Sequence, residues 1–247
     1  MSLCEACDEP LVVEIDNEPD DSEIETSQVP DDLKLRCGCH YHWQCLMDEA
    51  STLCISPKCP NCNTFISTNE GGSSTASTTT VILVDYTNEG GLQQNLDILP
   101  SIKEEAYVQD NPESVPARAL HIMCAEGDVE GIVELLRDVA NQQAHIGSIL
   151  CHQDPLSDMQ SGLHVAIRNK QDEAVWLLLW LASSLPTVTF PESVHRATGL
   201  VGLGRLSMEP LDDIRNLKDS HGHTAEQLAR QQPEYWSVLL NTGILAP

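Results

Sequence analysis

Residues 37–45 read Cys-Gly-Cys-His-Tyr-His-Trp-Gln-Cys and decide the fold together with Cys-Pro-Asn-Cys at residues 59–62. A further pair, in Cys-Glu-Ala-Cys at residues 4–7, precedes them across a gap of 29 residues. Zinc prefers four thiolate or imidazole ligands, and two cysteines separated by two residues can both reach one ion. Eight ligands suffice for two complete sites. In chain order, the predicted ligands are Cys4, Cys7, Cys37, Cys39, His42, Cys45, Cys59 and Cys62.

The cysteines are concentrated in a segment that has few aromatic residues to form a hydrophobic core. Eight of the ten lie from Cys4 to Cys62, and the only aromatic residues before position 65 are Tyr41 and Trp43. About 60 residues bury too little surface to fold comfortably alone, so this cysteine density indicates disulfides or metal. The amino-terminal residues do not resemble a secretory signal, so disulfides are the weaker explanation. Structural zinc contributes about 10–16 kcal/mol in small peptides, so two ions would replace the missing core.

The charge of the chain disfavours several classes of partner. The net charge is −25, and the segment from Asp8 to Asp32 contains eleven carboxylates but no Lys or Arg. Binding to nucleic acid or anionic lipid depends on clustered cations, so neither a nucleic acid nor a membrane is expected as a partner. The longest apolar run, residues 174–182, is about half as long as a membrane span. The sequence therefore predicts an intracellular protein, cytoplasmic or nuclear, without a transmembrane segment.

Two polar segments interrupt the amino-terminal half. The acidic residues within 8–36 are typical of a solvated loop, with recruitment of a basic partner as the alternative interpretation. Residues 11–15 have the composition of a short strand near the first cysteine pair. Residues 70–80, Glu-Gly-Gly-Ser-Ser-Thr-Ala-Ser-Thr-Thr-Thr, are typical of a flexible linker, and a domain boundary is expected there.

Beyond this linker the pattern predicts a strand at residues 81–86, a turn at 88–91 and a helix around 102–108, without indicating a function. The resulting division of the chain is a zinc-binding domain at 1–66, a linker region at 67–114 and a helical domain at 115–247.

The carboxyl-terminal half contains an internal repeat. Leu120–His121 is followed by apolar residues at the same offsets as Leu163–His164, and residues 222–225, Gly-His-Thr-Ala, begin a third copy. In the third copy, Glu226 and Gln227 replace the leucine and the histidine. His121 and His164 thus occupy one position of a repeated structure, so both are interpreted as structural residues.

The spacing of the eight ligands resembles that of RING fingers, which share the ligand order, the tight centre and the final Cys-Pro-x-Cys at 59–62. Cys39 stands where histidine is usual, and it keeps every interval of the family, whereas His40 would lie too close to His42. PHD fingers and the RING-CH variant have the same ligand order, but they have more residues between the fourth ligand and the histidine than the two that separate Cys39 from His42 here. The resemblance implies a cross-brace in which the first Zn2+ is held by Cys4, Cys7, His42 and Cys45, and the second by Cys37, Cys39, Cys59 and Cys62.

RING fingers are mostly ubiquitin-ligase modules, which hold a charged ubiquitin-conjugating enzyme and gain rate through proximity without a catalytic residue of their own. The resemblance implies contacts to that enzyme from Ala6, Leu46 and Pro60. Three residues depart from the pattern of active RING ligases. Ala6 is small for a contact residue, Glu49 stands where many relatives have tryptophan, and Asn63 stands where active ligases often have a cationic residue. A non-catalytic zinc-binding adaptor is therefore the alternative. Closed four-ligand sites hold no activated water, which disfavours a zinc hydrolase.

The repeated segments resemble ankyrin repeats: residues 119–121 and 162–164 match the family's Thr-Pro-Leu-His, and residues 125–128 match its inter-helix turn. The repeat spacing requires insertions around 140–155 and over 183–215. The resemblance implies a surface that recruits a protein substrate or partner. The predicted fold is thus a small RING-like α+β zinc module, a flexible linker and an all-α ankyrin solenoid with insertions.

Three cysteines, Cys54, Cys124 and Cys151, remain outside the zinc ligands. A nucleophilic cysteine needs a base and an orienting partner, and nothing in the sequence marks Cys54 as activated. It is therefore interpreted as a spare thiol. No catalytic residue is predicted.

Overall fold

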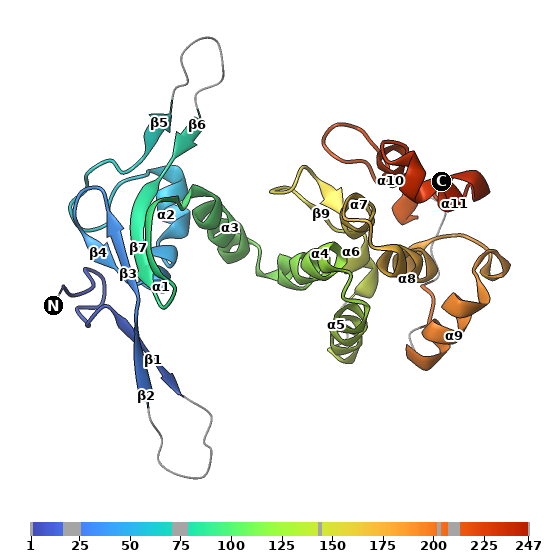
Figure 1. Ribbon diagram of the computed structural model, residues 1–247, viewed down its shortest axis with the longest axis horizontal. Coiled ribbons are helices and arrows are strands. Elements are labelled where there is room, and N and C mark those ends of the chain that lie inside the picture. Colours follow the sequence, from blue (N-terminus) through green and yellow to red (C-terminus); the bar gives the residue numbers. More distant parts are fainter. Residues whose placement is uncertain are drawn as a thin grey trace. The chain divides into compact units, whose positions relative to one another are not determined.

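The computed structural model divides the chain into two compact units, Met1–Pro112 and Glu113–Pro247, each with its own hydrophobic core (Figure 1). The acidic residues 17–25 and the polar residues 71–78, predicted as loop and linker, lie outside the residues that the structure describes. Those described are residues 2–16, 26–70, 79–142, 145–201, 204–206 and 213–246.

A four-stranded antiparallel sheet with the order β4-β3-β7-β8 organises the first unit. Side chains of a strand alternate between its two faces, and on the central strand Leu33 and Leu35 are buried while Lys34 between them is exposed. The strands are β3 (Asp32–Leu35), β4 (His40–Tyr41), β7 (Leu83–Asn88) and β8 (Gly91–Asp97).

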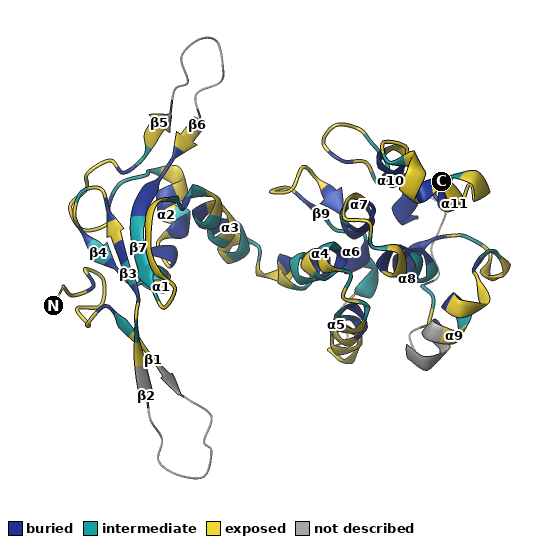
Figure 2. Cartoon of the chain, viewed as in Figure 1, coloured by how far each residue is buried: buried dark blue, intermediate teal, exposed yellow. Residues whose placement is uncertain are grey.

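Three helices contribute to the same core as the buried face of this sheet: α1 (Trp43–Met47), α2 (Ala50–Ile55) and α3 (Leu99–Asp110). Leu46, Leu53 and Ile102 are fully buried there, and Figure 2 shows the buried positions of these elements in dark blue. The sequence interpretation assigned residues 67–114 to a linker region. In the structure, β7, β8 and α3 belong to the first unit, because their apolar side chains complete the core that β3 begins.

The short elements predicted in this half are confirmed. The strand expected near the first cysteine pair is β1 (Val12–Asp16), which pairs with β2 (Thr26–Pro30). The strand and turn expected over residues 81–91 form the β7–β8 hairpin, and the expected helix lies within α3. A further pair is formed by β5 (Thr68–Glu70) and β6 (Thr79–Val81).

The second unit is helical, as predicted, and contains three pairs of helices: α4 (Val115–Glu126) with α5 (Val129–Asn141), α7 (Gly162–Arg168) with α8 (Asp172–Ala182), and α10 (Ala225–Ala229) with α11 (Pro233–Thr242). The first helix of each pair packs on that of the next, α4 on α7 and α7 on α10. The segments between the pairs contain α6 (Ile146–Leu150), β9 (Gln153–Asp154), β10 (Gln160–Ser161), η2 (Thr187–Thr189), α9 (Glu192–Val201) and η3 (Ile214–Asn216), and η1 (Pro112–Ser114) precedes α4.

Local capping sets the ends of these helices. α4 ends at Gly127, whose φ of +78° favours glycine, and Asp128 then caps α5 by accepting the N–H of Gly131 at 2.9 Å. Gln171 donates to the carbonyl of Ala125 at 2.9 Å and so links the second pair to the turn of the first. The apolar run of α8 is mostly buried in the core. Among the described residues, no helix has both the length and the apolar character needed to cross a bilayer.

The two histidines of the repeat differ in their surroundings. Nε2 of His164 lies 3.0 Å from the carbonyl of His223 and therefore donates to it, which leaves Nδ1 to accept from the Ser161 hydroxyl at 2.7 Å. His164 thus joins the second and third helix pairs, as a structural residue would. His121 is also buried, but neither of its ring nitrogens has a hydrogen-bond partner among the described residues. Burial and the nearby ring of His152 lower the pKa of His121 to about 4.

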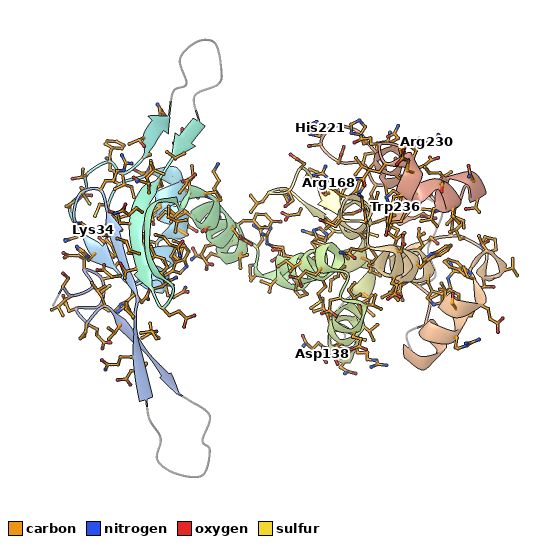
Figure 3. The ribbon with its side chains drawn as sticks, in the orientation of Figure 1. Lys34, Asp138, Arg168, His221, Arg230 and Trp236 are labelled. Carbon is orange, nitrogen blue, oxygen red and sulfur yellow. The ribbon has the colours of Figure 1, made fainter. Side chains whose placement is uncertain are left out.

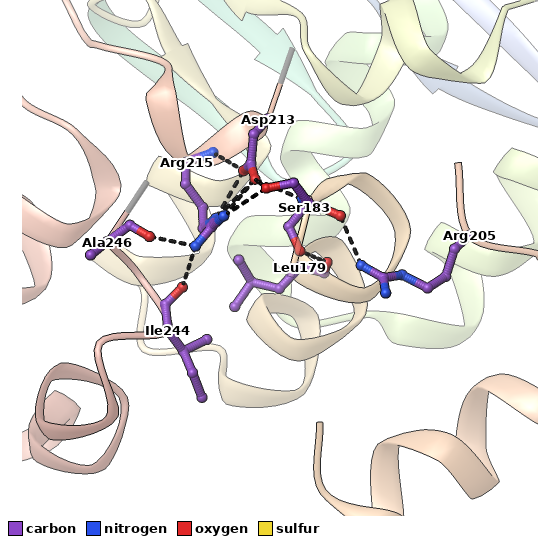
Figure 4. A network of polar contacts seen from close by, with 8 residues as sticks. Leu179, Ser183, Arg205, Asp213, Arg215, Ile244 and Ala246 are labelled. Carbon is purple, nitrogen blue, oxygen red and sulfur yellow. Dashed lines mark hydrogen bonds and ion pairs between the residues drawn. The ribbon is translucent and has the colours of Figure 1, made fainter. Parts of the chain in front are cut away.

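A buried ion pair holds the carboxyl-terminal tail of the second unit (Figure 4). Nη2 of Arg215 lies 2.6 Å from Oδ2 of Asp213, and the two side chains are 7% and 1% exposed. Arg215 also donates to the carbonyls of Ile244 and Ala246, while Asp213 accepts the N–H and the hydroxyl of Ser184, both at 2.7 Å. Burial alone would raise the pKa of Asp213, but hydrogen bonds from Arg215 and Ser184 lower it to about 2.

Replacing Arg215 by alanine should destabilise the second unit by about 3–5 kcal/mol, because the charge of Asp213 would stay buried without its partner. Chemical denaturation monitored by circular dichroism measures this change. Arg196→Ala is the matched control, since Arg196 forms an exposed helical ion pair with Glu192 and its loss should cost about 0.5 kcal/mol or less. Equal effects of the two substitutions would contradict the account.

Stability of the second unit should fall as the pH is lowered from about 6.5 to about 4. The unfolded chain then binds a proton at His121 that the folded chain does not accept, because the pKa of His121 is lowered from 6.5 to about 4. The loss should approach about 3 kcal/mol from this residue. Unfolding midpoints across this range should depend less on pH in His121→Leu than in the unchanged protein. Parallel curves would show that His121 is not the group responsible.

Candidate metal centres

The structure gathers the eight predicted ligands into two groups of four, and within each group the ligand atoms all lie within 4.8 Å of one another. The groups interleave along the chain. The first and third ligand pairs form one group, and the second and fourth pairs form the other. Their members are Cys4, Cys7, His42 and Cys45 in the first group and Cys37, Cys39, Cys59 and Cys62 in the second.

The outer cysteine pairs lie in two turns of the same construction. In the first, Asp8 has a φ of +61° and donates its N–H to the carbonyl of Cys4 at 2.9 Å. In the second, Asn63 has a φ of +58° and donates to the carbonyl of Cys59 at 2.9 Å. Asp and Asn tolerate this left-handed conformation better than most residues. Asn63, a departure from active ligases, therefore has a structural role in its turn.

The inner ligands come from one continuous hairpin and helix. Gly38, with a φ of +92°, makes the turn between β3 and β4 and places Cys37 and Cys39 in the second group. His42 follows β4 directly and precedes the short helix α1, which contains Cys45. The segment from β3 to α1 thus supplies two ligands to each group, so the two sites can form only together with this hairpin.

The hydrogen bonds of His42 identify the nitrogen that is available to a metal. Nε2 lies 2.9 Å from the carbonyl of Pro10, which can only accept, so Nε2 carries the proton. Nδ1 lies 3.4 Å from Sγ of Cys7 and 3.8 Å from Sγ of Cys45. This is the usual arrangement of a metal-binding histidine, whose second nitrogen donates to a carbonyl.

The thiols in each group differ in how readily they ionise. Burial raises the pKa of Cys45 to about 12 and also raises that of Cys39. Burial opposes ionisation of Cys4 as well, but hydrogen bonds from the backbone N–H groups of His42, Ala6 and Cys7 lower its pKa to about 7. The Thr64 hydroxyl lowers the pKa of Cys62 to about 6. Four thiolates so close together repel one another, and a bound cation would hold them all in the charged form.

Three residues that the sequence interpretation did not single out support these groups. The Tyr41 hydroxyl lies 3.3 Å from Sγ of Cys59 and accepts the N–H of Asn61 at 3.2 Å. Asn61 also donates to the carboxylate of Glu5 at 2.6 Å, which joins the two cysteine turns. Asp31, buried at the end of the acidic run, accepts the N–H that begins α1 and the hydroxyl of Tyr86. The sequence could have indicated a supporting role for Tyr41 and Asn61, because both lie among the predicted ligands. No signal in the sequence distinguishes Asp31 from the other carboxylates of the acidic run.

The residues expected to contact a conjugating enzyme are not equally accessible. Ala6 and Pro60 are exposed, each between the two cysteines of its turn. Leu46 is 0% exposed and belongs to the core of the first unit. The expectation that its side chain meets a partner is therefore inconsistent with this fold, in which the position contributes to packing instead.

The three remaining cysteines lie apart from the two metal groups. Burial raises the pKa of Cys124 to about 12 and raises that of Cys54, so neither thiol is activated. Neither group of four has a vacant ligand position, and sets of four thiolates or of three thiolates and one imidazole are those of structural zinc sites. Neither family models nor curated protein sequences nor solved structures yield a match to this chain, so the assignment depends on its own residues.

Cys59→Ser should remove the second ion and unfold the first unit, because metal binding and folding are coupled in such small domains. Zinc content after extensive dialysis, together with circular dichroism, measures both effects. Cys54→Ser is the matched control, since this exposed cysteine lies outside both groups, and it should retain two ions. Two tightly bound ions in Cys59→Ser would contradict the assignment.

Proposed function

We propose that this chain is a RING-type E3 ubiquitin ligase whose zinc ions are structural. The observation that carries the proposal is the interleaved pairing of eight ligands across two groups, since the cross-brace is characteristic of the RING fingers that the ligand spacing resembles. The protein would contribute no nucleophile or general base. It would hold a conjugating enzyme and an acceptor together, and the rate gain would come from proximity and orientation.

The exposed surface at the two cysteine turns is the proposed docking site for the conjugating enzyme. Ala6 and Pro60 lie in these turns, and the hydrogen bond between Glu5 and Asn61 holds the turns together. A rigid connection between them supports the proposal, because a docking surface composed of two loops loses less entropy when the loops are already fixed.

The second unit would select the substrate as an ankyrin-repeat domain. The packing of α4 on α7 and of α7 on α10, and the link from His164 to the third pair, support this interpretation. Stacked helix pairs present an extended surface to partner proteins.

A non-catalytic adaptor is the second candidate. The burial of Leu46 and the small side chain of Ala6 favour it, because both reduce the apolar surface that a conjugating enzyme could contact. In that case the zinc module would bind another protein, and no conjugating enzyme would bind measurably.

The purified protein, incubated with activating enzyme, ubiquitin, ATP and a panel of conjugating enzymes, should modify itself. Pro60→Ala should slow this reaction about fivefold or more, as expected for loss of a central contact. Ala6→Ile should accelerate it about two- to fivefold by adding apolar contact area. Pro155→Ala, at an exposed proline of the second unit, serves as the control. Absence of activity with every conjugating enzyme would overturn the ligase proposal and favour the adaptor.

A further inference from the structure

The turn before the last helix pair carries two histidines and an aspartate, in the sequence Asp-Ser-His-Gly-His at residues 219–223. Asp219 donates its N–H to the carbonyl of His223 at 2.9 Å, and Gly222, with a φ of +79°, donates to the carbonyl of Asp219 at 2.9 Å. This closed turn brings the rings of His221 and His223 to a centroid separation of 6.1 Å. His221 is exposed at the surface of the second unit (Figure 3).

The carboxylate of Asp219 is only half satisfied. Its side chain is 1% exposed, and Oδ1 accepts the N–H groups of His221 and His223 at 3.0 and 2.8 Å. Oδ2 is buried without a hydrogen-bond partner among the described residues. Buried carboxylate oxygens rarely lack a partner, and an oxygen that does so is a candidate ligand for an ion. Burial alone would raise the pKa of Asp219, but the N–H groups of His223 and His221 lower it, so the group is charged.

Nδ1 of His223 lies 3.6 Å from Oδ2 of Asp219. This separation is too long for a hydrogen bond. It does fit two ligands of one ion, because nitrogen and oxygen atoms each about 2.0–2.2 Å from zinc at a tetrahedral angle lie about 3.3–3.6 Å apart. Asp219 and His223 are therefore already spaced as a metal-binding pair.

The third ligand requires a change of one side chain. His221 does not converge with the other two in this conformation. Because it is exposed, it can exchange rotamers at little cost, and the site requires a rotamer that brings its imidazole to the ion held by Asp219 and His223. The turn itself is held in place, since Ser220 donates to the carbonyl of Asp158 at 2.8 Å and His164 donates to that of His223 at 3.0 Å.

We propose that Asp219, His221 and His223 form a third metal site, which takes one divalent transition-metal ion, with Zn2+ as the preferred species. Two imidazoles and one carboxylate suit zinc. They leave a coordination position for water, so this ion exchanges, whereas the two cysteine-bound ions are enclosed by four protein ligands. Since His164 holds the carbonyl of His223, the bound ion would also stabilise the junction between the second and third helix pairs.

The test uses the whole 247-residue chain after its two groups of four Cys and His ligands have been loaded with zinc. Titration with Zn2+, followed by isothermal calorimetry, should show one further saturable site per chain. The added ion should raise the unfolding temperature of the second unit by preferential binding to the folded state.

Three variants and one control distinguish the site from general binding to surface histidines. His221→Ala and His223→Ala should each weaken this binding about tenfold or more. Asp219→Asn can keep the hydrogen bonds of Oδ1 to the turn while removing the charged ligand, and it should weaken binding without lowering the unfolding temperature in chelator. His145→Ala removes another exposed histidine of the same unit and should bind as the unchanged protein does. The proposal would be overturned if the unchanged protein bound no third ion, or if His223→Ala and Asp219→Asn bound it as tightly as the unchanged protein does.

Discussion

The first unit is organised around two groups of four Cys and His side chains that alternate along the chain, and each group could hold one metal ion. The hairpin of β3 and β4 and the following helix α1 contribute to both groups, so neither site can be completed by a local segment. Each site instead joins the hairpin or helix to a distant cysteine turn. A hydrophobic core also stabilises this unit. Leu33 and Leu35 of β3 and Leu46 of α1 belong to the same core as buried residues of β7 and α3. Because thiolates so close together repel one another, the fold is expected to require the cations.

The second unit obtains its stability in a different way. Its helix pairs pack on one another through apolar side chains, and polar groups serve at the junctions, where Gln171 and His164 connect consecutive pairs. The tail is held by Arg215 and Asp213, a buried pair whose desolvation cost is offset by hydrogen bonds to backbone carbonyls and to Ser184. The two halves should therefore respond differently to chelators and to acid.

Sequence reasoning selected the eight residues that the structure gathers into two groups of four, because cysteine and histidine spacing reports directly on metal chemistry. It also placed the strands and helix between residues 81 and 108, but it assigned them to a linker region. The strand β3, which pairs with β7, precedes the metal-binding segment in the sequence, and such non-local pairing leaves no local pattern. The burial of Leu46 and of Asp31 was missed for the same reason, since both depend on what α1 packs against. The different surroundings of His121 and His164 could not be predicted either. His164 has a local partner in Ser161, but its second partner, the carbonyl of His223, is distant in the sequence, and His121 is buried without such a partner among the described residues.

The central claim is the interleaved assignment of ligands to the two ions, and cadmium substitution tests it most directly. With both sites loaded with 113Cd, nuclear magnetic resonance detects scalar coupling from each ion to the protons of its own ligands. The account predicts one resonance coupled to Cys4, Cys7, Cys45 and the His42 ring, and a second coupled to Cys37, Cys39, Cys59 and Cys62. A resonance coupled to Cys4, Cys7, Cys37 and Cys39 together would mean that the ions are bound one after the other along the chain, and it would contradict the cross-brace.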